Sequence, residues 1–392
     1  MTHVEAVTMD QAEPITFVGG AVLGDAGLRT EDLTLADGHF ARGAGGRALR
    51  ADGLWLLPGL VDLHGDGFER QLAPRRGVMT DLETGLLAVE TELAAAGITT
   101  AWLAQFWSWE GGMRGPDFAQ RFAAALTAMR PRIRLDLRMQ LRYERTMIDD
   151  ADAVLALVAA HGIDYLVFND HIPHDRLAAG RPPPRLAGAA AKAGRGPEAH
   201  MAVMAALAAR AAEVPSSVAR MAAALRARGT RLGSHDDPDG AARRLWSSQG
   251  LDIAEFPLSQ DAAEAARARG ESVIMGAPNV VRGGSHKRGG LAAETLIAAG
   301  RVDALASDYH YPSLSAAAFG LAARGVLPLA EAWRLVSRAP ASIMGLTDRG
   351  WIAEGLRADL MLYDPETRRI VGLFAGGAPV LLLGGAAARL FA

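Results

Sequence analysis

Cysteine is absent from this chain of 392 residues, which excludes disulfides, thiolate metal ligands and a cysteine nucleophile together. The same absence is compatible with a reducing compartment, so a cytoplasmic location is expected. Any metal ion must therefore be held by histidine and carboxylate side chains.

A large excess of charge of either sign is also lacking, because the chain has 41 basic and 44 acidic residues and a formal net charge of −3. This balance gives no reason to expect nucleic acid or an anionic membrane as a partner. No apolar run approaches the roughly 18 residues that a membrane span needs, and the first twenty residues lack the basic start of a secretory signal. We expect a small-molecule substrate, and a homodimer is one assembly that stays open.

Two widespread catalytic motifs are missing as well. The glycine-rich stretches at 43–47 and 282–286 do not lie between a strand and a helix with the glycine spacing of a P-loop or dinucleotide-binding motif. A Gly-x-Ser-x-Gly nucleophile elbow is absent too. Phosphate binding by a P-loop and serine-hydrolase chemistry are therefore not expected.

What the chain does have is a repeated pattern of apolar runs followed by helical stretches. The runs at 59–64, 99–104, 134–143, 165–169, 231–235, 253–256, 272–275 and 304–308 are typical of buried strands. Most precede a helical pattern, for example at 81–96, 149–161, 216–228, 260–269 and 291–300. About eight such units predict an α/β fold, a (β/α)8 TIM barrel.

The two ends of the chain differ from this middle part, since both contain short strand-like runs separated by turns. We predict that residues 1–57 and 346–392 together form one small β-sandwich domain, and that residues 58–345 form the barrel. The segment 176–200 interrupts the barrel rhythm, because it is basic and rich in proline and glycine. It is expected to be a mobile surface loop or, since it follows a barrel strand, a lid over the active site.

Side chains that can bind metal follow five of the predicted strands. They are His64, Asp66, Glu144, His171, His235 and Asp308. One such residue at a strand end is more often a capping or hydrogen-bonding group than a ligand. Six at the rim that forms the active site of a barrel predict a metal centre, because converging carboxylates need cations. The expected cofactors are two divalent ions, with zinc placed before manganese or iron.

The run from Pro58 to Asp66, Pro-Gly-Leu-Val-Asp-Leu-His-Gly-Asp, with the later Glu, His, His and Asp, resembles the amidohydrolase superfamily. Further stretches are similar to its PhnM branch: 94–100, 234–237, 253–257, Met275-Gly-Ala-Pro-Asn-Val-Val-Arg-Gly-Gly-Ser-His286 and 307–309. The resemblance covers roughly residues 50–345. It implies a barrel with a terminal β-sandwich. It also implies hydrolysis of α-D-ribose 1-methylphosphonate 5-triphosphate to the 5-phosphate and pyrophosphate, a step of phosphonate breakdown.

The resemblance also implies a role for each ligand. His64 and Asp66 would bind the more buried ion, and Glu144 would bridge the two ions. His171 and His235 would bind the second ion. Asp308 would be the catalytic residue, which binds the first ion and takes the proton of the bridging water. A metal-bridging hydroxide would then attack the triphosphate of a ribose 1-alkylphosphonate 5-triphosphate.

A phosphorylated substrate needs cations beyond the metal ions. Arg282, His286 and Lys287 supply three basic side chains beside two glycines. Arg142, Asn279 and Tyr309 are further candidates for substrate contact.

The chain departs from the branch at 64–70, 107–116 and 308–313, all next to the predicted ligands. An amide or cyclic-amide hydrolase of the deacetylase or dihydroorotase kind, with the same centre, therefore stays open as an alternative. A barrel used only for binding is disfavoured, because all six ligands are present.

Overall fold

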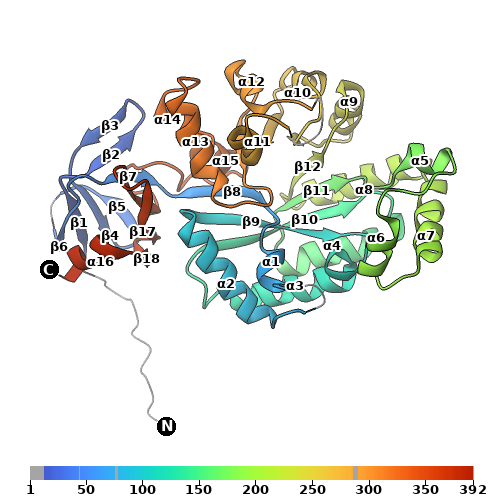
Figure 1. The fold of residues 1–392 in the computed structure, drawn as a ribbon, viewed down its shortest axis with the longest axis horizontal. Helices are drawn as coiled ribbons and strands as arrows, with labels where there is room; N and C mark the ends of the chain where they lie inside the picture. Colours follow the sequence, from blue (N-terminus) through green and yellow to red (C-terminus); the bar gives the residue numbers. More distant parts are fainter. Residues whose placement is uncertain (1–12, 44, 76–77, 286–289, 392) are drawn as a thin grey trace, which may run out of the picture.

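A closed barrel of eight parallel strands forms the middle of the molecule (Figure 1). The computed structural model describes residues 13–43, 45–75, 78–285 and 290–391. The strands follow one another in chain order: β8 Leu60–Gly65, β9 Ile98–Trp107, β10 Asp136–Glu144, β11 Tyr165–Asn169, β12 Arg231–His235, β13 Ile253–Glu255, β14 Ser272–Gly276 and β15 Ala304–Ala306. A parallel bridge between Gly65 and Asp308 joins the last strand to the first. The predicted barrel is confirmed.

Helices cover the outside of the barrel because their apolar faces pack on the outward side chains of the strands. They are α1 Glu69–Leu72, α2 Leu82–Ala95, α3 Pro116–Met129, α4 Ala151–His161, α8 Val214–Arg226, α9 Gly240–Ser248, α10 Gln260–Arg267, α11 Ala277–Arg282, α12 Ala293–Ala298, α13 Ser313–Ala323 and α14 Leu329–Arg334. α15 Arg338–Ile343 differs, because its Ala341 and Ile343 pack with the other set of strand side chains, which includes Val61 and Ile253. Local sequence sets several helix starts, since the side chains of Asp81, Asp239 and Ser259 each accept a first-turn N–H. No single helix in the described ranges is long and apolar enough to cross a membrane. Among the described residues, one pair of helices, α7 Pro197–Ala209 and α8, reaches that length and apolar content together, but the pair is bent by 80°.

Two further sheets lie beside the barrel and combine both ends of the chain (Figure 1). One has the order β5-β4-β1-β6 and the other β18-β17-β16-β7-β2-β3. Their strands are β1 Ile15–Val18, β2 Ala21–Gly24, β3 Gly27–Thr30, β4 Leu33–Ala36, β5 His39–Ala41, β6 Arg47–Arg50, β7 Trp55–Pro58, β16 Leu360–Asp364, β17 Arg369–Ala375 and β18 Ala378–Leu382, followed by α16 Gly384–Phe391. A shared apolar core joins the sheets, with the rings of Phe17 and Phe374 5.3 Å apart. The domain limits at 57/58 and 345/346 stay a proposal.

The segment after β11 contains helices, whereas its proline and glycine content predicts a loop. It contains α5 His174–Ala178, α6 Leu186–Lys192 and α7 Pro197–Ala209 (Figure 1, green). The alanine-rich stretches supply these helices, because alanine has the highest helix propensity. A small core of Trp109, Ile172 and Met204 holds the segment against the loop after β9, and the guanidinium of Arg195 donates to the carbonyl of Trp109 at 2.6 Å. The prediction of a loop is therefore wrong for most of this segment, whereas its mobility and the lid stay predictions.

Candidate active site

Closure of the barrel brings three of the predicted ligands together. The Asp308 N–H donates to the carbonyl of His64 at 2.8 Å, and the Asp66 N–H donates to the carbonyl of Asp308 at 2.9 Å. These two bonds interlock the carboxyl end of the first strand with that of the last. As a result, one ligand atom from each of His64, Asp66 and Asp308 lies within 4.8 Å of the other two. The backbone pairing that completes the fold therefore also assembles a potential metal site.

Gly65 is required between the first two of these ligands. A Cβ at this position would lie 2.5 Å from the Tyr311 ring and 2.8 Å from a carboxylate oxygen of Asp62. The Tyr311 ring is fully buried and occupies the space that a side chain at residue 65 would need. Two departures from the PhnM pattern, at 65 and in 308–313, are therefore one packing feature that leaves the ligands in place.

Glu255 at the end of β13 holds two imidazoles at once, and the sequence-based site did not include it. Its Oε2 lies 2.8 Å from Nδ1 of His64 and 2.8 Å from Nδ1 of His235. Its other oxygen accepts from the amide of Gln140 at 2.8 Å and the hydroxyl of Tyr165 at 3.2 Å. Burial alone would raise the pKa of Glu255, but the two imidazoles hold it below its ordinary range. The ionised carboxylate therefore accepts a proton-bearing Nδ1 from each ring.

This arrangement leaves Nε2 as the nitrogen of each imidazole that carries no proton. A ligating histidine usually donates its other ring N–H to a carboxylate, which fixes the tautomer and the ring orientation. His64 and His235 both show that arrangement, and their rings stack with centroids 5.3 Å apart. Imidazole nitrogen with carboxylate oxygen is a donor set that zinc, manganese and iron accept. The residues around His64 therefore fit a divalent ion.

The electrostatics differ between the two imidazoles. Burial lowers the pKa of His64, but Glu255 and the nearby Asp66 outweigh it and raise the pKa overall. Burial together with the adjacent Arg142 lowers the pKa of His235 to about 4. Burial also raises the pKa of Asp308 to about 6, and the carboxylate of Asp66 adds to this shift. The carboxylates of Glu255 and Asp66 thus stabilise a positive charge near His64, whereas His235 already lies beside the positively charged guanidinium of Arg142.

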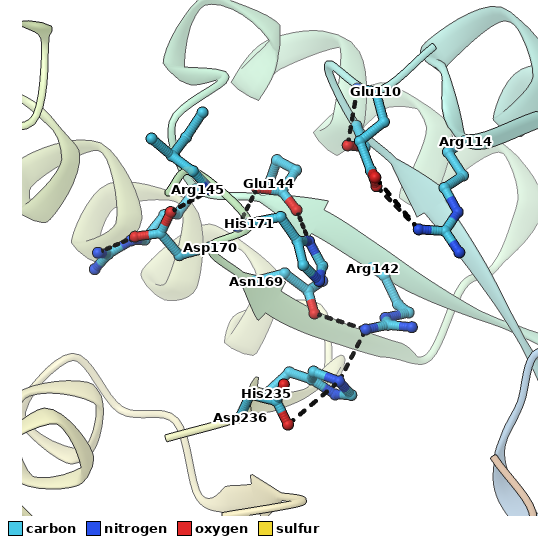
Figure 2. A network of polar contacts seen from close by, with 12 residues as sticks. Glu110, Arg114, Arg142, Glu144, Arg145, Asn169, Asp170, His171, His235 and Asp236 are labelled. Carbon is cyan, nitrogen blue, oxygen red and sulfur yellow. Dashed lines mark hydrogen bonds and ion pairs between the residues drawn. The ribbon is translucent and has the colours of Figure 1, made fainter. Parts of the chain in front are cut away.

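The predicted ligands of the second ion do not converge. Glu144 and His171 contact each other, through Oε1 and Nδ1 and through a 3.1 Å bond from the His171 N–H to Oε2. Nε2 of His235 instead accepts from Nη2 of Arg142 at 2.9 Å, and Figure 2 shows Arg142 between His235 and Asn169. In the described part of the chain, the groups that could hold an ion include neither Glu144 nor His171. The two-ion centre stays a prediction.

The predicted substrate contacts occupy different positions. Arg142 is buried beside the histidines. Arg282 lies at the end of α11, where its guanidinium contacts the hydroxyl of the exposed Tyr309. The amide of Asn279 bonds to the carbonyl of Leu291 and the N–H of Ala293, both at 2.9 Å, so it braces the α11–α12 connection. His286 and Lys287 fall outside the described residues.

A cavity of ≈ 330 Å³ connects the ligand cluster to the outside. His235, Asp308 and Arg282 all line it. The rest of the lining combines polar side chains with apolar ones, namely Asp236, Asn279 and Ser285 with Phe256, Pro257, Leu258, Met275 and Leu291. A small molecule in this cavity would contact both the potential metal site and a cation.

Comparison with known proteins identifies the family. Residues 76–371 match the model of the family described as "Amidohydrolase family". The chain belongs to the amidohydrolase family. It is 36% identical over 329 residues to α-D-ribose 1-methylphosphonate 5-triphosphate diphosphatase of Escherichia coli (strain K12), and the match covers 80% of this chain and 84% of that protein. The chain is therefore a PhnM-like member of the superfamily, as its motifs predict.

Solved structures of the family share the fold at low identity. β-Aspartyl dipeptidase from Fervidobacterium islandicum AW-1 matches with a TM-score of 0.61 and 15% identity, over 95% of this chain and 97% of that one. N-acetylglucosamine-6-phosphate deacetylase from Pasteurella multocida matches with a TM-score of 0.62 and 10% identity, over 94% and 100% of the two chains. These likenesses show the architecture of the amidohydrolase family and nothing about the substrate.

Proposed function

We propose that this protein is a metal-dependent hydrolase that cleaves the triphosphate of a ribose 1-alkylphosphonate 5-triphosphate to the 5-phosphate and pyrophosphate. The observation that carries the proposal is the triad of His64, Asp66 and Asp308, whose ligand atoms converge at the barrel rim. It occurs in a chain that is 36% identical to a diphosphatase of that substrate. A bound divalent ion would act there as a Lewis acid and lower the pKa of water.

Asp308 is suited to hold the proton that the attacking water releases. Its carboxylate lies in the triad, so it would be within hydrogen-bond reach of a water on a bound ion. A general base needs this proximity to the proton that it takes. Asp308 would therefore accept the proton and return it to solvent or to the departing pyrophosphate.

Two arginines provide positive charge for the phosphate oxygens. Arg282 lines the same cavity as Asp308, and Arg142 lies beside His235. Guanidinium groups bind phosphate through paired N–H donors, which is why they suit this role. His286 and Lys287, next in the chain after Ser285, stay proposed phosphate contacts from the sequence alone.

One observation favours the alternative, an amide or cyclic-amide hydrolase with the same metal site. Phe256, Leu258 and Met275 are apolar, and they line the same cavity as His235 and Asp308. A ring amide or an N-acyl group would bury apolar surface there, whereas a triphosphate would not.

A substrate panel separates the two functions. Protein loaded with zinc or manganese is supplied with ribose 1-methylphosphonate 5-triphosphate, with N-acyl amino sugars and with dihydropyrimidines, and initial rates are compared. We expect turnover of the triphosphate, and a rate lower by about 10²–10⁴ for Asp308→Asn, because that change removes the proton acceptor. Turnover of amides alone would refute the proposal in favour of the alternative.

A further inference from the structure

Arg142 lies on β10 at a position that faces the interior of the barrel. Successive side chains of a strand point to opposite sides. Leu141 and Tyr143 join the outer core with the helices, whereas Gln140 reaches inward to the carbonyl of Leu63. The guanidinium of Arg142 therefore projects into the ring of strand ends that holds the candidate ligands. Arg142 is 4% exposed, so its guanidinium is a buried cation and not a surface group.

Contacts on several sides hold this guanidinium in place. Nη2 donates to Nε2 of His235 at 2.9 Å and to the side-chain oxygen of Asn169 at 3.3 Å (Figure 2). The guanidinium carbon lies 4.0 Å from the ring centroid of Phe106, on the neighbouring strand β9. A cation over an aromatic face is stabilised when it is shielded from water. Arg142 is thus fixed by groups from three adjacent elements, β9, β11 and β12.

The guanidinium of Arg142 forms different contacts with the two imidazoles. Nε2 of His235 is occupied by the 2.9 Å bond, and an ion on this atom would sit at about 2.1 Å, on the same lone pair. Nε2 of His64 has only a contact of 3.5 Å with Nη1, at the outer limit of a hydrogen bond. The metal-binding atom of His64 is therefore accessible, and that of His235 is not.

The other predicted ligands of the second ion are engaged as well. Both oxygens of Glu144 contact His171, one through the ring and one through the main-chain N–H. The two groups in the described chain that could hold an ion both contain His64. In one of them Glu255 accepts from both imidazoles, so His64, Asp66 and Asp308 remain as the three convergent ligands.

We propose that the guanidinium of Arg142 takes the place of the second metal ion, so that the centre combines one divalent ion on His64, Asp66 and Asp308 with a permanent cation beside it. Nη2 already has two acceptors, whereas Nη1 has only the long contact to His64 among the described residues. Nη1 is therefore the donor that would meet a substrate oxygen next to the ion.

This arrangement has a consequence for the choice of substrate. A guanidinium offers hydrogen bonds of fixed direction, and it cannot provide a bridging water as a second ion would. A substrate with an anionic oxygen next to the scissile bond would be stabilised by hydrogen bonds from this guanidinium. The proposal rests on the metal dependence assigned above and not on the identity of the substrate.

Metal stoichiometry tests the proposal without any assay of activity. Purified protein is stripped with a chelator and dialysed to equilibrium against manganese, and bound metal is measured by elemental analysis together with the electron paramagnetic resonance spectrum. We expect one equivalent per chain and the spectrum of an isolated ion. Two equivalents with the spectrum of a spin-coupled pair, or no bound ion at all, would overturn the proposal.

His64→Ala and His235→Ala form a matched pair, because each removes one imidazole that donates to the same oxygen of Glu255. His64→Ala should weaken binding of the ion at least 100-fold, and His235→Ala should keep one equivalent with an affinity within about fivefold of the wild type. Loss of the ion in a folded His235→Ala protein would contradict the proposal. If either variant fails to fold, as judged by circular dichroism, the wild-type stoichiometry decides.

These outcomes are distinguishable from a failure of the proposed function. One bound ion without release of pyrophosphate would refute the substrate and leave the one-ion centre standing. Release of pyrophosphate by a protein that binds two ions would support the proposed substrate and refute the one-ion centre.

Discussion

The carboxylate of Glu255 determines which nitrogen of two histidines faces the active site. Both Nδ1 atoms donate to its Oε2, while Gln140 and Tyr165 hold its other oxygen. Full burial makes this carboxylate sensitive to change, because a buried charge is tolerated only when its hydrogen bonds are made. Its contribution to catalysis is therefore indirect, through the orientation of His64.

Glu255→Gln should weaken metal binding about 10- to 100-fold, as expected when the partner of a ligating histidine is changed. The amide nitrogen of glutamine would also face the donor groups of Gln140 or of an imidazole. Metal affinity is measured by competition with a chelator, and Glu264→Gln, an exposed change on α10, is the control. Unaltered affinity in Glu255→Gln would show that the histidines are oriented by other groups.

Several site residues could be predicted from the sequence for a physical reason. Parallel strands end at one rim of a barrel, so His64, Asp66 and Asp308 had to lie near one another once the strands were recognised. Glu255 gave the same signal, a carboxylate that closes a buried strand, and it could have been found by the same rule. The bond between Arg142 and His235 was not predictable, because the strand order places the two residues near each other on β10 and β12 but does not determine which groups their side chains contact.

At the scale of elements, the loop after β9 and the helices after β11 support each other. Arg195 donates to the carbonyl of Trp109, and the Trp109 ring lies 5.3 Å from that of His200 on α7. Cβ atoms added at Gly111 and Gly112 would meet the backbone of Ala193 and Lys192, at 3.2 and 2.8 Å. Composition alone favoured a loop at 176–200, because the partners that order it lie about 80 residues earlier in the chain.

Trp109→Ala should loosen this contact, since removal of a buried tryptophan costs about 3–5 kcal/mol when a cavity is left. We expect faster hydrogen–deuterium exchange in α7 and a lower thermal stability. Leu245→Ala, at an exposed position on α9, should change neither. Unchanged exchange in α7 would show that the insertion is ordered without the β9 loop.

On the scale of the whole molecule, an ionic contact joins the barrel to the segment that leads into the terminal sheets. Arg349 is 6% exposed, and it donates to Asp136 at 2.7 Å and to the hydroxyl of Thr100 at 3.0 Å. Burial raises the pKa of Asp136, but its bonds to Arg138 and Arg349 outweigh this, and the pKa lies below its ordinary value of 3.8. The folded protein therefore binds this proton less readily than the unfolded chain.

A lowered pKa of this kind stabilises the folded state above pH ~4, and the stabilisation is lost as the pH falls through the lower, folded-state value. Arg349→Met should reduce the free energy of unfolding by about 2–3 kcal/mol at pH 7, because it leaves Asp136 with one partner fewer. The difference from wild type should shrink below pH ~3. Denaturant titrations at several pH values measure it, with the exposed Arg369→Met as control. A deficit that stays constant with pH would exclude the ion pair as its cause.

The central claim, hydrolysis of a phosphoanhydride at the His64–Asp66–Asp308 site, is tested most directly by phosphorus-31 nuclear magnetic resonance. Ribose 1-methylphosphonate 5-triphosphate is mixed with the metal-loaded protein and the spectrum is followed over time. The account predicts pyrophosphate and the 5-phosphate monoester in equal amounts, and no product with Asp308→Asn at the same concentration and over the same interval. A spectrum that stays unchanged, or one in which orthophosphate appears in place of pyrophosphate, would contradict it.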